Sequence, residues 1–169
     1  DVPGLAYRPR WGADGGTMRL NRLACPLDPD RLPDPARRLF PIDMYRTPWT
    51  VLTARGGCPF RCRFCLYPQT FTGHEFRVRS IDNVVEELKY IKREFPDVRD
   101  IFIEDDTFTV DKERVAEFCG RLMKERLGVT WTANARADLD YGLLKLMGEA
   151  GNRLLCVGFE SRNPAAIDA

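Results

Sequence analysis

The stretch that decides the fold is Gly56-Gly57-Cys58-Pro59-Phe60-Arg61-Cys62-Arg63-Phe64-Cys65, where three cysteines follow a C-x3-C-x2-C spacing within eight residues. Two glycines and a proline favour an open loop, so the three thiolates can converge on one metal cluster. A cubane held in this way has one iron without a protein ligand. The spacing therefore predicts a [4Fe-4S] cluster on Cys58, Cys62 and Cys65.

The residues around this loop predict alternating strands and helices. Apolar side chains from Ile81 to Ile91 recur at helical spacing after Ser80, a residue that favours the start of a helix. Strands are expected at 49–54, 100–104, 129–133 and 154–158, and helices at 81–94, at 111–126 and from a cap at Asp138 or Asp140 to Ala150. Such alternation is typical of an α/β fold with a parallel sheet.

The cysteine spacing, with the aromatic Phe64 directly before Cys65, resembles the signature of the radical S-adenosylmethionine superfamily. The resemblance implies that the free iron of the cluster binds S-adenosylmethionine. Reductive cleavage then gives a 5′-deoxyadenosyl radical that takes a hydrogen atom from substrate. Reduced flavodoxin or ferredoxin is the electron donor that this chemistry implies, and Phe64 is expected to lie beside the adenine and to shield the cluster.

The same resemblance implies a partial TIM barrel, of which the full eight-stranded form takes about 250 residues. We therefore expect 48–169 to be the N-terminal part of the radical domain, with about four βα units in a truncated chain. Residues 1–47, with the proline-rich run 27–36, predict an extended connector. This connector resembles the segment that follows a cobalamin-binding domain in cobalamin-type members, so cobalamin is expected only through such a domain, which is missing here.

Three further segments resemble radical proteins of hopanoid lipid tailoring: 48–56, 65–70 and 104–109. They imply a small-molecule or lipid substrate, such as a hopanoid intermediate. Two alternatives remain open. A methylthiotransferase acting on transfer RNA shares the cysteine spacing but should bring another N-terminal domain with three cysteines. The second alternative is a non-enzymatic module that binds an iron-sulfur cluster or zinc. Zinc normally takes four protein ligands, whereas the loop offers three cysteines.

Polar side chains follow the predicted strands, and in βα barrels the active face is built by the loops after the strands. Glu104, Asp105 and Asp106 are consecutive carboxylates that repel one another unless a cation or donors meet them. By resemblance, Asp105 or Asp106 binds the methionyl ammonium of S-adenosylmethionine, with Glu104 behind. The alternative is that they only cap the next helix.

The next two strand ends carry Asn134, Arg136 and Glu160. Arg136 could bind the methionyl carboxylate and Asn134 a ribose hydroxyl, with two ordinary rim residues as the alternative. Glu160 is a candidate for the cofactor or for a buried ion pair with Arg136.

The remaining cysteines and the single histidine are expected to be structural. Cys119 and Cys156 lie in apolar patterns, which predict that they are core residues. Cys25 has no predicted role, and His74 is a loop residue without an identified partner. Arginines around the cysteine loop could attract an anionic substrate or an electron donor: Arg55, Arg61, Arg63, Arg77 and Arg79.

Composition predicts a protein without a membrane span. The chain is 44% hydrophobic and 30% charged, and no apolar run approaches the roughly 20 residues that cross a bilayer. A net charge of +1 gives no overall attraction to nucleic acid or acidic lipid. We expect a cytoplasmic location, with peripheral membrane association as an alternative that a lipid substrate would favour.

Overall fold

The computed structural model describes residues 2–8, 17–22, 27–41, 44 and 49–163. Cys25 lies outside the described residues, as does most of the segment 163–168, whose sequence favours the start of another helix. The domain boundary expected at residue 48 also falls on a residue that is not described, and the division into connector and radical domain stays a prediction.

The centre of the structure is a four-stranded sheet in the order β3-β6-β7-β8, and every neighbouring pair is parallel. Its strands are β3 (Trp49–Leu52), β6 (Asp100–Ile103), β7 (Thr130–Ala135) and β8 (Asn152–Val157). The order follows the sequence because each strand pairs with the next one along the chain. The predicted α/β fold with four parallel strands is confirmed.

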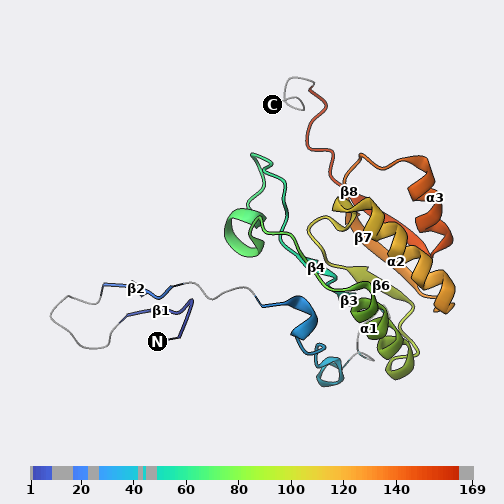
Figure 1. Cartoon of the computed structure of the whole chain (residues 1–169), viewed down its shortest axis with the longest axis horizontal. Coiled ribbons are helices and arrows are strands. Elements are labelled where there is room, and N and C mark those ends of the chain that lie inside the picture. Colours follow the sequence, from blue (N-terminus) through green and yellow to red (C-terminus); the bar gives the residue numbers. More distant parts are fainter. Residues whose placement is uncertain (1, 9–16, 23–26, 42–43, 45–48, 164–169) are drawn as a thin grey trace.

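Three helices connect these strands and lie against the sheet (Figure 1). They are α1 (Ile81–Glu94), α2 (Lys112–Glu125) and α3 (Tyr141–Glu149). Each begins at a side chain that accepts a backbone N–H three residues ahead, and these caps are Ser80, Asp111 and Asp140. Asp140, rather than Asp138, therefore starts the third helix.

The core lies between the sheet and the helices. Ile101, Ile103 and Trp131 point from the strands into one buried apolar cluster with side chains of all three helices. At its centre, the rings of Phe108, Phe118 and Trp131 meet edge to face with centroids 5.4–5.5 Å apart. The indole N–H of Trp131 donates to the carbonyl of Ala150, 3.0 Å away, so its polar atom is also satisfied.

Several short elements were not expected from the sequence. The connector contains a two-stranded antiparallel pair, β1 (Ala6–Tyr7) with β2 (Arg19–Leu20), which lies apart from the main sheet (Figure 1). The others are the 3-10 turns η1 (Pro29–Arg31), η2 (Arg37–Leu39) and η5 (Phe108–Val110), a second antiparallel pair of β4 (Arg55–Gly56) with β5 (Arg77–Val78), and the π-helical turn η4 (Pro68–Thr72).

Of the two cysteines expected in the core, one is there and one is not. Cys119 is fully buried in α2, which confirms the expectation. Cys156 is exposed on β8, and the prediction of a core position was wrong. Strand β8 is the last strand of the sheet among the described residues, and on it Leu155 packs on the core while the alternate residues Leu154 and Cys156 face the other way.

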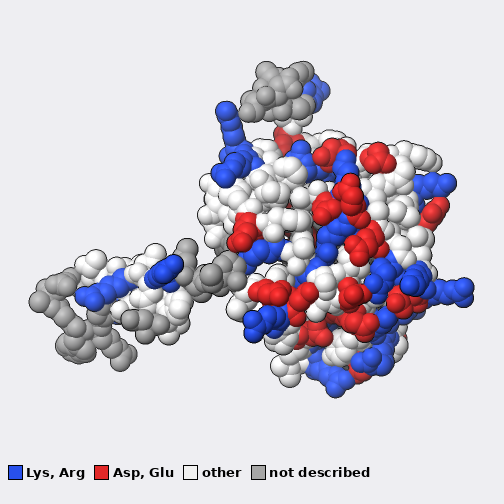
Figure 2. Space-filling view, in the orientation of Figure 1, with Lys and Arg blue, Asp and Glu red and all other residues white. Residues whose placement is uncertain are grey.

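Charge and hydropathy agree with the composition. Lys and Arg are interspersed with Asp and Glu over the visible face of the α/β part, without a large field of one sign (Figure 2). Among the helices that the structure describes, none combines the length and the apolar character needed to cross a membrane.

Candidate functional site

The candidate site lies at the edge of the sheet where the parallel strands end. Because neighbouring strands run in the same direction, the loops that follow β3, β6, β7 and β8 begin at this edge. The loop after β3 carries the cysteines and runs from residue 53 to 80, where α1 begins. The cysteine loop, as we call residues 53–80, therefore starts beside the acidic end of β6.

The first residues of the cysteine loop are held by the β4–β5 pair, in which Gly56 faces Arg77. Gly57 follows with a positive φ of 79°. A Cβ at Gly57 would lie 1.9 Å from the carbonyl oxygen of Glu75, a separation that real side chains do not adopt. Only glycine fits this close approach of two backbone segments, which gives the second glycine of the doubled pair a physical reason.

The three cysteines are free thiols on this loop. Cys58 is buried, and Cys62 and Cys65 are half-buried. The N–H of Cys58 donates to the carbonyl of Gly73 over 3.0 Å, and Nδ1 of His74 lies 3.1 Å from the carbonyl oxygen of Cys58. A carbonyl oxygen only accepts, so Nδ1 of His74 carries the proton in this contact. His74 thus has a partner, and its role in this structure is to hold the first cysteine.

The described residues include no group of three His, Cys, Asp or Glu side chains placed to hold a metal ion. Thiolate ligands repel one another until a metal neutralises them, and metal binding commonly completes the folding of such loops. The donor set itself, three free thiols on one loop, fits an iron-sulfur cluster, and the assignment of Cys58, Cys62 and Cys65 as its ligands stays a prediction.

The acidic end of β6 contains three carboxylates in three different environments. Asp105 is buried, and its Oδ1 accepts the backbone N–H of Ala54 over 2.9 Å. Asp106 is half-buried, with an Oδ2 that is shielded from solvent and has no hydrogen-bond partner among the described residues. Glu104 is exposed. The structure thus joins Asp105 to the root of the cysteine loop and leaves Asp106 an acceptor oxygen for a ligand.

Asn134 and Arg136, at the end of β7, both lie near this edge. The Asn134 side-chain amide donates to the backbone carbonyl of Asp105 over 2.9 Å. The Arg136 guanidinium lies over the ring of Phe60 in the cysteine loop, with 4.2 Å between Cζ and the ring centroid. Its Nε is 3.5 Å from a carboxylate oxygen of Asp138, which gives Arg136 an exposed ion pair. Both residues therefore connect β7 to neighbouring loops.

Phe64 and Glu160 lie further from these contacts. Phe64 is 67% exposed, so most of its surface is open to solvent. Glu160 is also exposed, and its carboxylate turns back toward Gly158, where a Cβ would lie only 2.6 Å from Oε1. Of the two roles left open for Glu160, the buried ion pair with Arg136 is not found, since both side chains are exposed and Arg136 has Asp138 as its ion-pair partner.

The sequence pointed to candidate ligand-binding residues but did not point to the residues that hold the cysteine loop and its neighbours in place. Phe60 was not singled out, although an aromatic residue inside a cysteine loop is a place where a cation can stack. Thr109 was also missed, and its hydroxyl accepts the backbone N–H of Arg136 over 3.3 Å. Of the expected arginine rim, Arg61 and Arg63 are exposed, whereas Arg79 turns inward to the carboxylate of Glu87.

Comparison with known proteins identifies the family. Residues 54–168 match the radical SAM superfamily, and the chain belongs to it. The predicted membership of the radical SAM superfamily is thereby confirmed. The match begins at the root of the cysteine loop and spans α1, α2 and α3 together with the strands β6, β7 and β8.

The similar proteins include several methyltransferases. The chain is 33% identical to an uncharacterized methyltransferase, PH0819, of Pyrococcus horikoshii, over 99% of its own length and 36% of that protein. It is 31% identical to cytidylyl-2-hydroxyethylphosphonate methyltransferase of Streptomyces wedmorensis, over 92% of this chain and 31% of that one. It therefore spans about a third of the length of these two relatives.

A hopanoid enzyme and a solved structure are also similar. The hopanoid C-3 methylase of Methylococcus capsulatus is 29% identical over 67% of this chain and 20% of that protein. The methyltransferase TsrM of Kitasatospora setae, solved with cobalamin and a [4Fe-4S] cluster, superposes with a TM-score of 0.63 at 18% identity, over 69% of this chain and 22% of that one. At this identity the likeness supports the fold, and the predicted radical SAM fold is confirmed.

Proposed function

We propose that this chain carries the cluster-binding part of an enzyme that cleaves S-adenosylmethionine reductively. The observation that carries the proposal is the position of three free thiols on the loop after β3, at the edge where the parallel strands end, in a chain of the radical SAM superfamily. A [4Fe-4S] cluster on Cys58, Cys62 and Cys65 would supply the electron that yields a 5′-deoxyadenosyl radical.

The residues of the chain would bind and orient the S-adenosylmethionine. The shielded Oδ2 of Asp106 is an acceptor for the methionyl ammonium. Arg136, exposed beside the cysteine loop, is a donor for the methionyl carboxylate, and Phe60 holds its guanidinium in place. Asn134 already donates to the Asp105 carbonyl through one N–H, so its second N–H or its oxygen remains for a ribose hydroxyl.

For the substrate we propose a small organic molecule or lipid, with a hopanoid intermediate as the specific candidate. The similarity to a hopanoid C-3 methylase supports it, together with the three segments singled out in the sequence. A second candidate is methyl transfer to a different small molecule. It is supported by two relatives named as a cytidylyl-2-hydroxyethylphosphonate methyltransferase and a bacteriochlorophyllide d methyltransferase, and these names favour it over action on transfer RNA. The electron donor would be a reduced flavodoxin or ferredoxin, and the location cytoplasmic.

Anaerobic reconstitution tests the proposed reaction. The full-length protein is loaded with iron and sulfide, reduced with dithionite and given S-adenosylmethionine, and 5′-deoxyadenosine is measured by chromatography. We expect several iron atoms per chain and 5′-deoxyadenosine that depends on reductant. Iron without 5′-deoxyadenosine would favour a non-enzymatic iron-sulfur module, and bound zinc would favour a zinc module.

Deuterium transfer tests the substrate. Hydrogen abstraction from a deuterated hopanoid precursor would place deuterium in 5′-deoxyadenosine, which mass spectrometry detects. A deuterated sterol of similar size is the matched control and should leave 5′-deoxyadenosine unlabelled. Unlabelled product with the hopanoid would contradict this substrate while leaving the cleavage reaction intact.

A further inference from the structure

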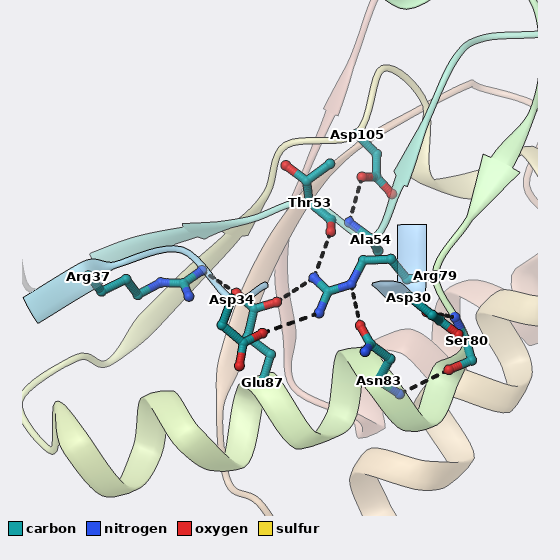
Figure 3. Close-up of polar contacts among 10 residues, drawn as sticks. All are labelled: Asp30, Asp34, Arg37, Thr53, Ala54, Arg79, Ser80, Asn83, Glu87 and Asp105. Carbon is teal, nitrogen blue, oxygen red and sulfur yellow. Dashed lines mark hydrogen bonds and ion pairs between the residues drawn. The ribbon is translucent and has the colours of Figure 1, made fainter. Parts of the chain in front are cut away.

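Helix α1 buries a carboxylate on its apolar face. Glu87 is only 2% exposed and lies among the core residues Val84, Leu88 and Ile91. Its Oε1 is 2.5 Å from Nη2 of Arg37, and its Oε2 forms an ion pair with Nη1 of Arg79 (Figure 3). Arg37 precedes the cysteine loop and Arg79 lies at the end of it, so Glu87 joins segments that are distant in sequence.

Burial makes this pairing energetically important. A charge removed from water is strongly destabilising unless counter-charges and hydrogen bonds replace its hydration. The side chains of Arg37 and Arg79 are themselves only 6% and 13% exposed. Asp34 lies 3.9 Å from Arg79 at the more exposed side of this cluster, so the buried charges are one carboxylate between two arginines. Removal of either arginine would leave buried Glu87 with one counter-charge instead of two.

Arg79 also holds the root of the cysteine loop. Its Nη1 donates to the carbonyl of Thr53 over 3.0 Å, and its backbone N–H donates to the carbonyl of Ala54 over 3.0 Å. The N–H of Ala54 in turn donates to Asp105 at the acidic end of β6. Figure 3 shows Arg37 and Arg79 on the Glu87 carboxylate, Arg79 also on the Thr53 carbonyl, and the Ala54 N–H on Asp105. The orientation of Arg79 therefore bears on the backbone that leads to the first cysteine.

Arg37 belongs to a segment that is attached to the same part of the fold at further points. We call residues 28–41 the N-terminal strap. Its Asp30 accepts the backbone N–H of Ser80 over 2.7 Å, and its Arg38 forms a more exposed ion pair with Glu94 near the end of α1. The strap thus lies along α1, and Arg37 is its buried anchor.

We propose that Arg37 is a positioning residue for the cysteine loop. Its positive charge and its cover over Glu87 keep that carboxylate ordered, so that Glu87 holds Arg79 against the Thr53 carbonyl. Without Arg37, Glu87 gains access to water and competing donors. Arg79 then loses its fixed partner, and the backbone at residues 53–58 opens more often. The proposal concerns the loop root and holds whatever substrate the enzyme takes.

Hydrogen exchange measured by NMR on the metal-free chain tests the proposal. In Arg37→Ala the loop root should open more often, so we expect the backbone amides of Ala54 and Arg79 to exchange at least about tenfold faster than in the parent. A tenfold change corresponds to a decrease of about 1.4 kcal/mol in the free energy of opening. Amides inside α2 should change less. Arg38→Ala is the matched control, since it removes the neighbouring arginine and its ion pair with Glu94 but no contact to Glu87. It should leave the loop root unchanged.

Three results would overturn the proposal. They are unchanged exchange at the loop root in Arg37→Ala, equal acceleration in Arg38→Ala, and an equal acceleration throughout α2 that marks only general destabilisation. If Arg37→Ala does not fold, Arg37→Lys decides, since it keeps the charge but loses the forked donor geometry. In Arg37→Lys the amide of Ala54 should exchange faster than in the parent, while the amides of α2 are unchanged. Exchange of the Ala54 amide at the rate of the parent would overturn the proposal.

Loss of iron gives a second readout. In reconstituted protein, a chelator should remove iron several-fold faster from Arg37→Ala than from Arg38→Ala, because the root of the loop opens more often. The exchange experiment does not depend on metal. A failure of the proposed cluster would therefore leave the proposal about Arg37 open to its own test.

Discussion

Arg136, at the end of β7, stacks its guanidinium on the ring of Phe60, with 4.2 Å between Cζ and the ring centroid. Phe60 lies between the first two cysteines of the cysteine loop, far from Arg136 in the sequence. A contact of this kind connects the tip of the loop to the sheet, whereas Arg79 and Asp105 hold its root. The loop is thus attached to the rest of the fold at both places.

The stacking contact predicts a measurable coupling between Phe60 and Arg136. A double-mutant cycle with Phe60→Leu and Arg136→Gln should give a coupling of about 0.5–1 kcal/mol in urea unfolding, the range for exposed cation–π pairs. Arg93 and Tyr90 on α1 form a control pair with a longer separation of 5.8 Å, and they should couple less. Additive effects of the Phe60 and Arg136 substitutions would mean that the stack contributes nothing.

Gly57 predicts a steric requirement in the loop root. In Gly57→Ala the new Cβ would meet the Glu75 carbonyl at 1.9 Å, on top of a φ of 79° that alanine adopts poorly. We expect destabilisation of at least about 2 kcal/mol, measured by thermal unfolding. Gly73→Ala separates the two causes, because Gly73 has a φ of 71° but open space around its Cβ position. Equal losses for both variants would show that the clash is relieved.

The acidic strand end predicts different roles for neighbouring carboxylates. Asp105→Ala should destabilise the fold by about 1–3 kcal/mol, because it leaves the buried N–H of Ala54 without its acceptor. Asp106→Ala should leave the melting temperature nearly unchanged and weaken S-adenosylmethionine binding in calorimetric titration of the reconstituted protein. Normal affinity in Asp106→Ala would move the ammonium site elsewhere, with Glu104 as the next candidate.

Cysteine reactivity tests the placement of Cys119 and Cys156. Burial raises the pKa of the Cys119 thiol to about 12, so its thiolate stays scarce at neutral pH and up to about pH 10. In the folded, metal-free protein, iodoacetamide should modify the exposed Cys156 and spare Cys119, as read by peptide mass spectrometry. Similar rates for the two cysteines would contradict these environments.

The long elements could be predicted because local signals agreed. Helix α1 has the predicted bounds, since Ser80 caps it, its apolar residues share one face and Pro96 follows its end. The two-residue strands β4 and β5 could not be predicted, because they exist only through their pairing across the cysteine loop. The same holds for β1 and β2 in the expected connector.

The partner of Glu87 and the exposure of Cys156 could not be predicted from the sequence. Glu87 occupies a helical position three residues after Val84 and four before Ile91, so its burial was visible in the pattern, but its partner Arg37 lies too far away in sequence to be found. On β8 the continuous apolar run 154–157 concealed the alternation that leaves Cys156 exposed. In both cases the missing information is tertiary, namely which side of an element another segment covers.

We propose that Cys58, Cys62 and Cys65 hold a [4Fe-4S] cluster with one iron open to S-adenosylmethionine. Electron paramagnetic resonance of the reduced, reconstituted full-length protein measures this cluster. We expect a [4Fe-4S]⁺ signal that changes when S-adenosylmethionine is added, that disappears when any one of these three cysteines is replaced by alanine, and that survives in Cys119→Ala. Persistence of the signal in the three single variants, or equal loss in Cys119→Ala, would mean that these cysteines are not the cluster ligands.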